Sequence, residues 1–186
     1  MKNAPITIGF DDSKFQLKSD IKKTQLIGIV CQGTRLVNVV RDEISIDGDD
    51  ATDILIRLAK LHLKEIQYIL TDTITFGGFN IIDMEQICNR TNKPVIAITE
   101  SLVNLNSVEL ALKKNFPDTY VSKMKRIMKA GDLYETEVLT AGGLSKVYYH
   151  VKGTSSEEVS ELLVKICIDS KLPEPIRIAH LIGKAL

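Results

Sequence analysis

The chain has 186 residues, of which 44% are hydrophobic and 26% charged, and its 24 basic residues balance its 24 acidic ones. This length and composition predict a single soluble globular domain over residues 1–186, with enough chain to bury a substantial core. The balanced charge excludes a global basic field, so nucleic-acid binding would require a local basic patch. No apolar run approaches the length of a membrane span.

The cysteines and the N-terminal segment point to a reducing compartment. Cys31, Cys88 and Cys167 lie far apart among apolar neighbours and form no C-x-x-C pair. Neither a zinc knuckle nor a disulfide framework is therefore predicted. The N-terminal MKNAPITIGF lacks the long apolar core of a signal peptide, so a cytoplasmic protein is expected.

The first half of the chain predicts four strands and one helix. A short apolar segment ends at Asp11 and Asp12, and two β-branched runs joined by a turn at Gly33 indicate a hairpin. Helical spacing follows the acidic turn Asp47–Asp50, and an apolar run then predicts a parallel strand. The expected elements are strands over 6–10, 24–31, 35–46 and 66–71, and a helix over 51–63.

The second half predicts helices, one buried strand and a further hairpin. A continuous apolar run after Pro94 is typical of a strand that is buried on both faces. Ser155 is an expected helix cap with Glu158 as its capping-box partner, and Pro173 and Pro175 open the last helix. The expected elements are helices over 80–90, 104–129, 157–168 and 176–186, and strands over 95–98, 134–140 and 146–151.

This order predicts an α/β fold of the ribonuclease H-like type. Three meandering strands that feed two strand–helix units give a mixed five-stranded sheet flanked by helices, with a small additional β-hairpin. In that arrangement the fourth strand lies beside the first. The carboxylate at the end of the first strand, Asp11 or Asp12, then becomes a neighbour of Asp72 at the end of the fourth.

Two interpretations of Asp72 are open at this point. Asp72 either caps a turn or helps to hold a divalent cation, because neighbouring carboxylates repel each other unless a cation binds them. Mg²⁺ suits one or two carboxylates together with waters and substrate phosphates. A third carboxylate is expected from the turn Asp47–Asp50 or from Asp53.

One dense basic segment, Lys123–Lys129, lies in the second half of the chain. It predicts either a solvated helix face or a patch that contacts phosphates through Lys123, Lys125 and Arg126.

Four separated stretches resemble a known family in the same order: IGFDDSKF (8–15), DGDDATD (47–53), TDTITFGGFNIID (71–83) and LPEPIRIAHLIGKAL (172–186). They resemble the uncharacterised, largely archaeal domain of unknown function 99, which is similar to endonuclease V. That resemblance implies a ribonuclease H-like fold and cleavage of a phosphodiester near a deaminated adenine with Mg²⁺ or Mn²⁺. It places the strand aspartates at Asp11 and Asp72, and a histidine of the active centre at His180.

The chain also departs from the endonuclease V pattern. The metal-binding glutamate of the first helix would fall near Arg57, the wedge that opens the base is replaced by residues 47–50, and glycines of the base pocket are replaced by Thr73 and Ile74. Asp50 or Asp47, close to the start of the same helix, is the expected substitute for the missing ligand.

The prediction is therefore a Mg²⁺- or Mn²⁺-dependent nuclease with altered substrate choice, acting on single-stranded or damaged DNA or RNA. Asp11, Asp72 and Asp50 would hold the metal, and His180 would orient groups or transfer a proton. The alternatives are a non-catalytic nucleic-acid-binding module of the same fold and a protein that binds a small molecule near Gly77 and Gly78. The sequence predicts no oligomeric state.

Overall fold

The computed structural model describes residues 3–15, 22–99 and 101–186. The first half forms a meander followed by alternating strands and helices. Its elements are β1 (Ile6–Asp12), β2 (Lys23–Gln32), β3 (Arg35–Ser45), α1 (Ala51–Lys60), β4 (Tyr68–Asp72), β5 (Thr75–Phe76), β6 (Asn80–Ile81) and α2 (Met84–Thr91). The second half comprises β7 (Val95–Thr99), α3 (Leu105–Asn115), α4 (Tyr120–Lys129), β8 (Tyr134–Thr140), β9 (Gly143–Lys152), α5 (Ser156–Ile166) and α6 (Glu174–Ala185).

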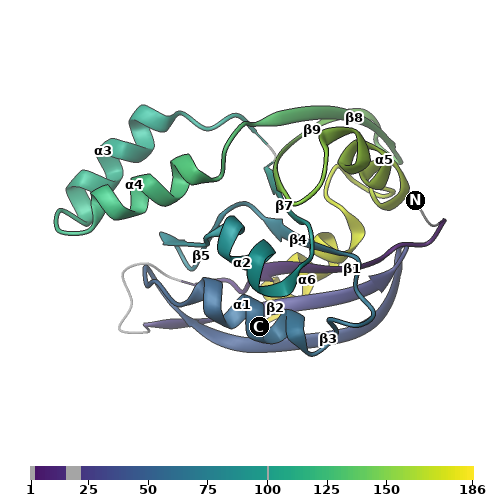
Figure 1. Ribbon diagram of the computed structural model, residues 1–186, viewed down its shortest axis with the longest axis horizontal. Helices are drawn as coiled ribbons and strands as arrows, with labels where there is room; N and C mark the ends of the chain where they lie inside the picture. Colours follow the sequence, from purple (N-terminus) through teal and green to yellow (C-terminus); the bar gives the residue numbers. More distant parts are fainter. Residues whose placement is uncertain (1–2, 16–21, 100) are drawn as a thin grey trace.

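The described strands build a seven-stranded mixed sheet in the order β3-β2-β1-β4-β7-β9-β8 (Figure 1). The central strands β1, β4 and β7 are parallel to one another, and the outer pairs are antiparallel. The expected mixed sheet flanked by helices is confirmed. The additional hairpin, however, does not stand apart, because β9 pairs with β7 and thereby extends the sheet.

Two apolar layers cover the sheet, one on each face. The alternation of β4 shows both, since Ile69 packs in the cluster that includes α1 and α2, whereas Tyr68 and Leu70 pack in the cluster that includes α5 and the start of α6. Successive strand residues point to opposite faces, and here both faces are covered by apolar layers. Residues 68–70 are therefore all apolar or aromatic, as expected for a central parallel strand. A third cluster joins α6 to β2 through Ala179 and Ile29.

Two helix predictions were wrong at particular residues. The helix expected over 104–129 is two helices that lie side by side at one end of the molecule (Figure 1). Pro117 disfavours helical dihedrals at Phe116, whose φ is −136° and ψ is 56°. The helix expected from residue 80 begins only at Met84, where the Asp83 side chain accepts from the Gln86 N–H. Residues 80–81 instead pair with 75–76 in a short second sheet.

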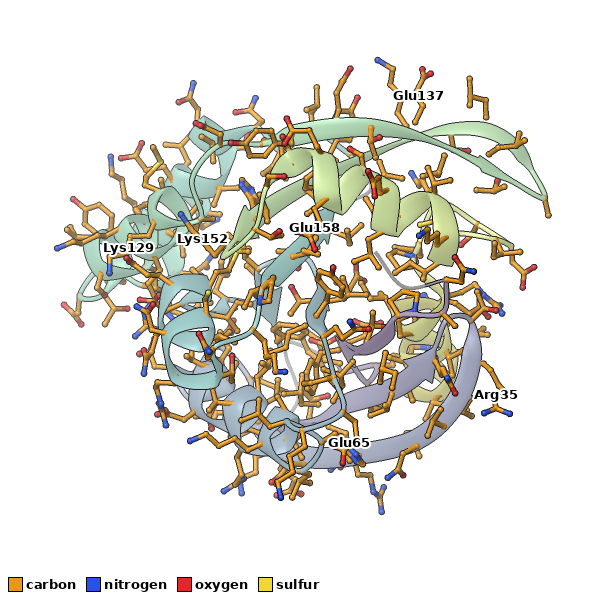
Figure 2. All side chains as sticks on the ribbon, turned by 45° about the vertical axis from the view of Figure 1, so that its right-hand side comes forward. Arg35, Glu65, Lys129, Glu137, Lys152 and Glu158 are labelled. Carbon is orange, nitrogen blue, oxygen red and sulfur yellow. The ribbon has the colours of Figure 1, made fainter. Side chains whose placement is uncertain are left out.

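Charged side chains of both signs surround the molecule. Figure 2 shows Arg35 and Glu137 directed outward at the rim of the view, and Glu158 beside α5. Ser155 caps α5 as expected, but the Glu158 carboxylate accepts from the Tyr68 and Thr154 hydroxyls instead of completing a capping box. Within the described ranges, no helix is long and apolar enough to cross a bilayer.

The packing of α6 on β1 depends on glycine at position 9. A Cβ at Gly9 would lie 2.8 Å from the Pro175 carbonyl carbon and 2.8 Å from the Ile176 nitrogen, so the helix backbone sits directly on the strand. We expect Gly9→Ala to lower the free energy of unfolding by about 1–3 kcal/mol, because the added methyl overpacks this contact. Denaturant titration measures this change.

Gly142→Ala is the matched control for Gly9→Ala. A Cβ there would meet only the Thr140 hydroxyl at 3.7 Å, in ordinary van der Waals contact. Equal destabilisation by both substitutions would contradict this account of the α6–β1 packing.

Candidate metal centre and the adjoining cavity

The parallel pairing of β1 with β4 brings two carboxylates together. Phe10 pairs with Thr71, so Asp11 and Asp72 follow at the same edge of the sheet. Both side chains point toward α6. Asp11 lies two residues after Gly9, which contacts α6, and Asp72 lies two residues after Leu70, which packs with the first turn of α6. Residues two apart in a strand share a face of the sheet. The structure thus makes Asp11 and Asp72 neighbours, as the predicted strand order requires.

α6 adds a histidine to the two carboxylates. His180 donates a hydrogen bond from Nδ1 to Asp11 Oδ2 over 2.8 Å. The carboxylate requires the hydrogen on Nδ1, which leaves Nε2 as an acceptor in the neutral ring. A close approach at the other end of α6 supports this placement, because a Cβ at Gly183 would lie 2.5 Å from the Asp12 carbonyl oxygen.

Asp11, Asp72 and His180 each offer a ligand atom, and these atoms lie within 4.8 Å of one another. Oxygen ligands with one imidazole nitrogen suit Mg²⁺ or Mn²⁺ better than a soft metal. Asp11 is only 6% exposed, so its negative charge lies in a poorly hydrated position that a cation would compensate. The residues present therefore fit a divalent cation.

Burial sets the protonation behaviour of the two adjacent aspartates. Desolvation raises the pKa of Asp11, although the hydrogen bonds from His180 and the Asp12 N–H oppose the rise. Desolvation, with the charge of Asp11, raises the pKa of Asp12 to about 6 despite a hydrogen bond from the Gly77 N–H. The sequence left Asp11 and Asp12 as alternatives. Their side chains point to opposite faces of β1. Asp11 therefore joins Asp72 and His180, whereas Asp12 accepts a hydrogen bond from the β5–β6 hairpin.

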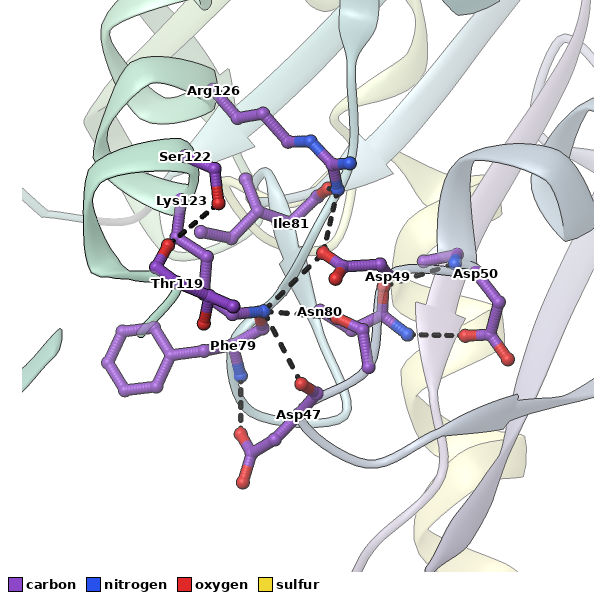
Figure 3. A network of polar contacts seen from close by, with 12 residues as sticks. Asp47, Asp49, Asp50, Phe79, Asn80, Ile81, Thr119, Ser122, Lys123 and Arg126 are labelled. Carbon is purple, nitrogen blue, oxygen red and sulfur yellow. Dashed lines mark hydrogen bonds and ion pairs between the residues drawn. The ribbon is translucent and has the colours of Figure 1, made fainter. Parts of the chain in front are cut away.

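The structure does not bring Asp50 into this group. Its carboxylate accepts from the Ser45 hydroxyl at 2.8 Å, from the Ser45 N–H and from the Asn80 amide at 2.6 Å. Burial alone would raise the pKa of Asp50, but these hydrogen bonds outweigh it and lower the pKa. Figure 3 shows Asp50 fastening the turn after β3 to the β5–β6 hairpin, which is a structural role.

Lys123 also differs from its expected role. It is 3% exposed, and its Nζ donates to the carbonyl oxygens of Phe79 at 2.7 Å, Gly48 at 3.1 Å and Asp47 at 3.3 Å (Figure 3). A buried lysine whose ammonium donates to three backbone carbonyls cannot contact substrate phosphates, which corrects its assignment to a basic surface. The interpretation failed because the sequence spacing of lysines does not tell which of them faces the interior.

The other basic residues of α4 mostly bind the protein itself. Arg126 donates to the Asp49 carboxylate at 3.0 Å and to the Ile81 carbonyl at 3.2 Å, and Lys129 lies 3.5 Å from the Asp83 carboxylate. Lys125 is exposed. The segment 123–129 thus holds the two-helix unit against the β5–β6 hairpin, with Lys125 as the predicted cation that remains directed to solvent.

Two cavities adjoin the carboxylates. The first, of about 590 Å³, contains the metal-ligand group and is lined by Asp11, Asp12, Ser13, Lys14, Phe15, Asp72, His180 and Lys184. The second, of about 480 Å³, begins at Thr73, the residue after Asp72, and is largely apolar. The sequence pattern did not reveal the second cavity, because its walls come from the segment after β4 and from β5, β7, α3, α4 and β9.

His150 contributes a polar group to the second cavity. Its Nδ1 lies 3.0 Å from the Asp132 carbonyl oxygen, which can only accept, so Nδ1 carries the hydrogen. The Nε2 atom is then an acceptor in the neutral ring. Phe79, which packs edge-on against Phe116, lines the same cavity.

Comparison with archaeal proteins shows close relatives over almost the whole chain. The chain is 38% identical over 183 residues to a UPF0215 protein of Thermococcus sibiricus, covering 96% of this chain and 90% of the relative. It is 37% identical over 186 residues to a UPF0215 protein of Methanocaldococcus jannaschii, covering 99% and 95%.

Solved structures share the fold. A protein of unknown function from Archaeoglobus fulgidus superposes with a TM-score of 0.84 at 27% identity over 97% of both chains. Endonuclease V of Ciona intestinalis, in complex with inosine-containing DNA, gives 0.61 at 16% identity over 95% of this chain and 82% of that one. Human endonuclease V gives 0.61 at 16% identity over 97% and 83%. At these identities the likeness to endonuclease V is one of fold.

The model of one family, described as Endonuclease dU, matches residues 6–186, and this chain belongs to that family.

Proposed function

We propose that this protein is a divalent-metal-dependent endonuclease that cleaves a phosphodiester of nucleic acid containing deoxyuridine. The observation that carries the proposal is the convergence of the Asp11 and Asp72 carboxylates with the His180 ring within 4.8 Å. The family description supplies the substrate, and the fold shared with endonuclease V supports a nucleic-acid ligand.

Asp11 and Asp72 would hold the cation at the edge of the sheet, with His180 beside it. A bound Mg²⁺ or Mn²⁺ would polarise the phosphate and lower the pKa of a bound water. The hydrogen bond from Nδ1 to Asp11 fixes the orientation of the His180 ring. Its Nε2 can then accept a proton from the attacking water or, once protonated, return one to the leaving oxygen.

The second cavity would accept the substrate base. An enzyme that acts beside a modified base takes that base out of the stack, and the cavity opens one residue beyond Asp72. The Phe79 ring offers a wall for stacking. As an acceptor, His150 Nε2 would bind the N3–H of uracil, whereas cytosine presents an acceptor at N3 and would be rejected.

A non-catalytic nucleic-acid-binding module is the second candidate. One observation favours it, namely that among the described residues no third carboxylate joins Asp11 and Asp72. Asp53, near the start of α1, forms an ion pair with Arg90. A module of this kind would bind the same substrate and leave it intact.

The first test of this proposal is the binding of Mn²⁺ alone. We expect Asp72→Asn to weaken Mn²⁺ binding by about tenfold or more, because one of two anionic ligands is lost. Isothermal titration calorimetry measures it, and Asp53→Asn, which alters an exposed carboxylate outside the group, should bind like the wild type. Equal affinity in the wild type and Asp72→Asn would remove the metal site from the proposal.

Cleavage itself distinguishes the enzyme from the module. We expect the wild type with Mg²⁺ or Mn²⁺ to nick an oligonucleotide carrying one deoxyuridine, and EDTA to abolish nicking. Asp11→Asn should lower the single-turnover rate by at least about a hundredfold, through loss of electrostatic stabilisation. Tight binding of the oligonucleotide without nicking under any of these metals would establish the module instead.

The base preference tests the second cavity. We expect His150→Phe to lower the cleavage rate of the uracil substrate by about tenfold or more and to reduce discrimination against cytosine, since the acceptor for N3–H is removed. Mn²⁺ binding should stay unchanged. His62→Phe is the matched control, because His62 bonds to Asn38 on the edge strand β3; a similar loss in both variants would count against the assigned cavity.

A further inference from the structure

The cleft around the metal-ligand group presents a charge problem for a nucleic acid. The carboxylates of Asp11 and Asp72 lie in it, and Asp12 adjoins them. A phosphate strand is a polyanion and would be repelled by them, so cations must offset these charges along the path of the strand. The basic segment of α4 does not supply them, because Lys123 is buried and Arg126 binds Asp49.

Two lysines that line the cleft carry positive charge at this place. Lys14 follows the end of β1, Lys184 lies in the last turn of α6, and both line the cleft. Each is exposed, and within the described part of the chain neither ammonium forms an ion pair.

The backbone fixes the two lysines at the same place. The Lys14 N–H donates to the Gly183 carbonyl at 3.2 Å. Gly183 permits this approach, because a Cβ there would lie 2.5 Å from the Asp12 carbonyl oxygen and 3.1 Å from the Ser13 Cα. Lys184 therefore starts one residue from the bond that anchors Lys14, and the positions of both follow from the same contact that seats α6.

The C-terminal end of α6 favours a cation at the position of Lys184. The last carbonyls of a helix carry partial negative charge, which repels phosphate and is offset by a basic residue in the final turn.

We propose that Lys184 and Lys14 bind phosphates of the substrate strand next to the scissile bond. The strand then crosses the end of β1 and the last turn of α6, and it does not follow α4. This inference rests on the proposed function for the identity of the ligand as nucleic acid. Lys184 is assigned to positioning of the strand and not to bond cleavage.

The experiment measures binding without cleavage. A fluorescent single-stranded oligonucleotide with one deoxyuridine is titrated with protein in EDTA over a series of KCl concentrations, and anisotropy gives the affinity and its salt slope. We expect Lys184→Ala to weaken binding by about threefold to tenfold and to reduce the slope by about 0.7, the contribution of one phosphate of a single strand. Lys184→Arg should restore both, and Lys14→Ala should act in the same direction.

The control and the competing path have their own variants. Lys60→Ala removes an exposed lysine at the end of α1 and should leave affinity and slope unchanged. Lys125→Ala tests a strand that follows α4. A loss of affinity in Lys125→Ala with none in Lys184→Ala would overturn the inference and leave the metal-dependent cleavage standing.

Two further outcomes separate the inference from a structural role and from the proposed function. If Lys184→Ala lowered the thermal midpoint or Mn²⁺ affinity but kept the salt slope, Lys184 would only stabilise α6 or Asp11, and the inference would be wrong. If the wild type neither bound nor cleaved the oligonucleotide with any divalent metal, the proposed function would fail and the inference with it.

Discussion

The contact between the α6 backbone and β1 is the constraint on which the candidate site depends. Without a side chain at Gly9, the first turn of α6 rests directly on the strand, and Gly183 does the same beside Asp12 at the other end of the helix. These two contacts set the height of α6 over the sheet. That height places His180 within hydrogen-bonding distance of Asp11, and it carries Lys184 to the rim of the same cleft.

The sequence predicted the part of the site that follows from strand order. Apolar runs ending on carboxylates, together with a meander followed by strand–helix units, were sufficient to make either Asp11 or Asp12 a neighbour of Asp72. Only the resemblance to a family chose Asp11. His180 came only from resemblance to a family, because a helix histidine carries no periodic signal of the carboxylate that it will meet. The sequence also predicted the fold, with two exceptions. It predicted one helix where Pro117 separates two, and it did not predict that β9 pairs with the main sheet.

The errors lie where the orientation of a side chain decides its role. Lys123 and Lys125 differ by two positions in one helix, yet Lys123 satisfies three carbonyls in the interior and Lys125 is exposed. Asp50 has the residue type of a metal ligand, but Ser45 and Asn80 occupy its carboxylate. Local patterns carry little information on such long-range partners, and the lysines of the cleft were missed for the same reason.

The distribution of charge bears on how the proposed site would work with two carboxylates. A third anionic ligand would favour a second cation, and two cations would offset more phosphate charge at the cleft. Asp53, one of the carboxylates expected as a third ligand, pairs with Arg90 instead. Lys14 and Lys184 instead bring fixed positive charge to the cleft. Fixed ammonium groups would offset the phosphate charge without the cost of assembling a second metal site. Under the proposed function, a single cation would act together with lysines that are supplied by the same α6–β1 contact that positions the histidine.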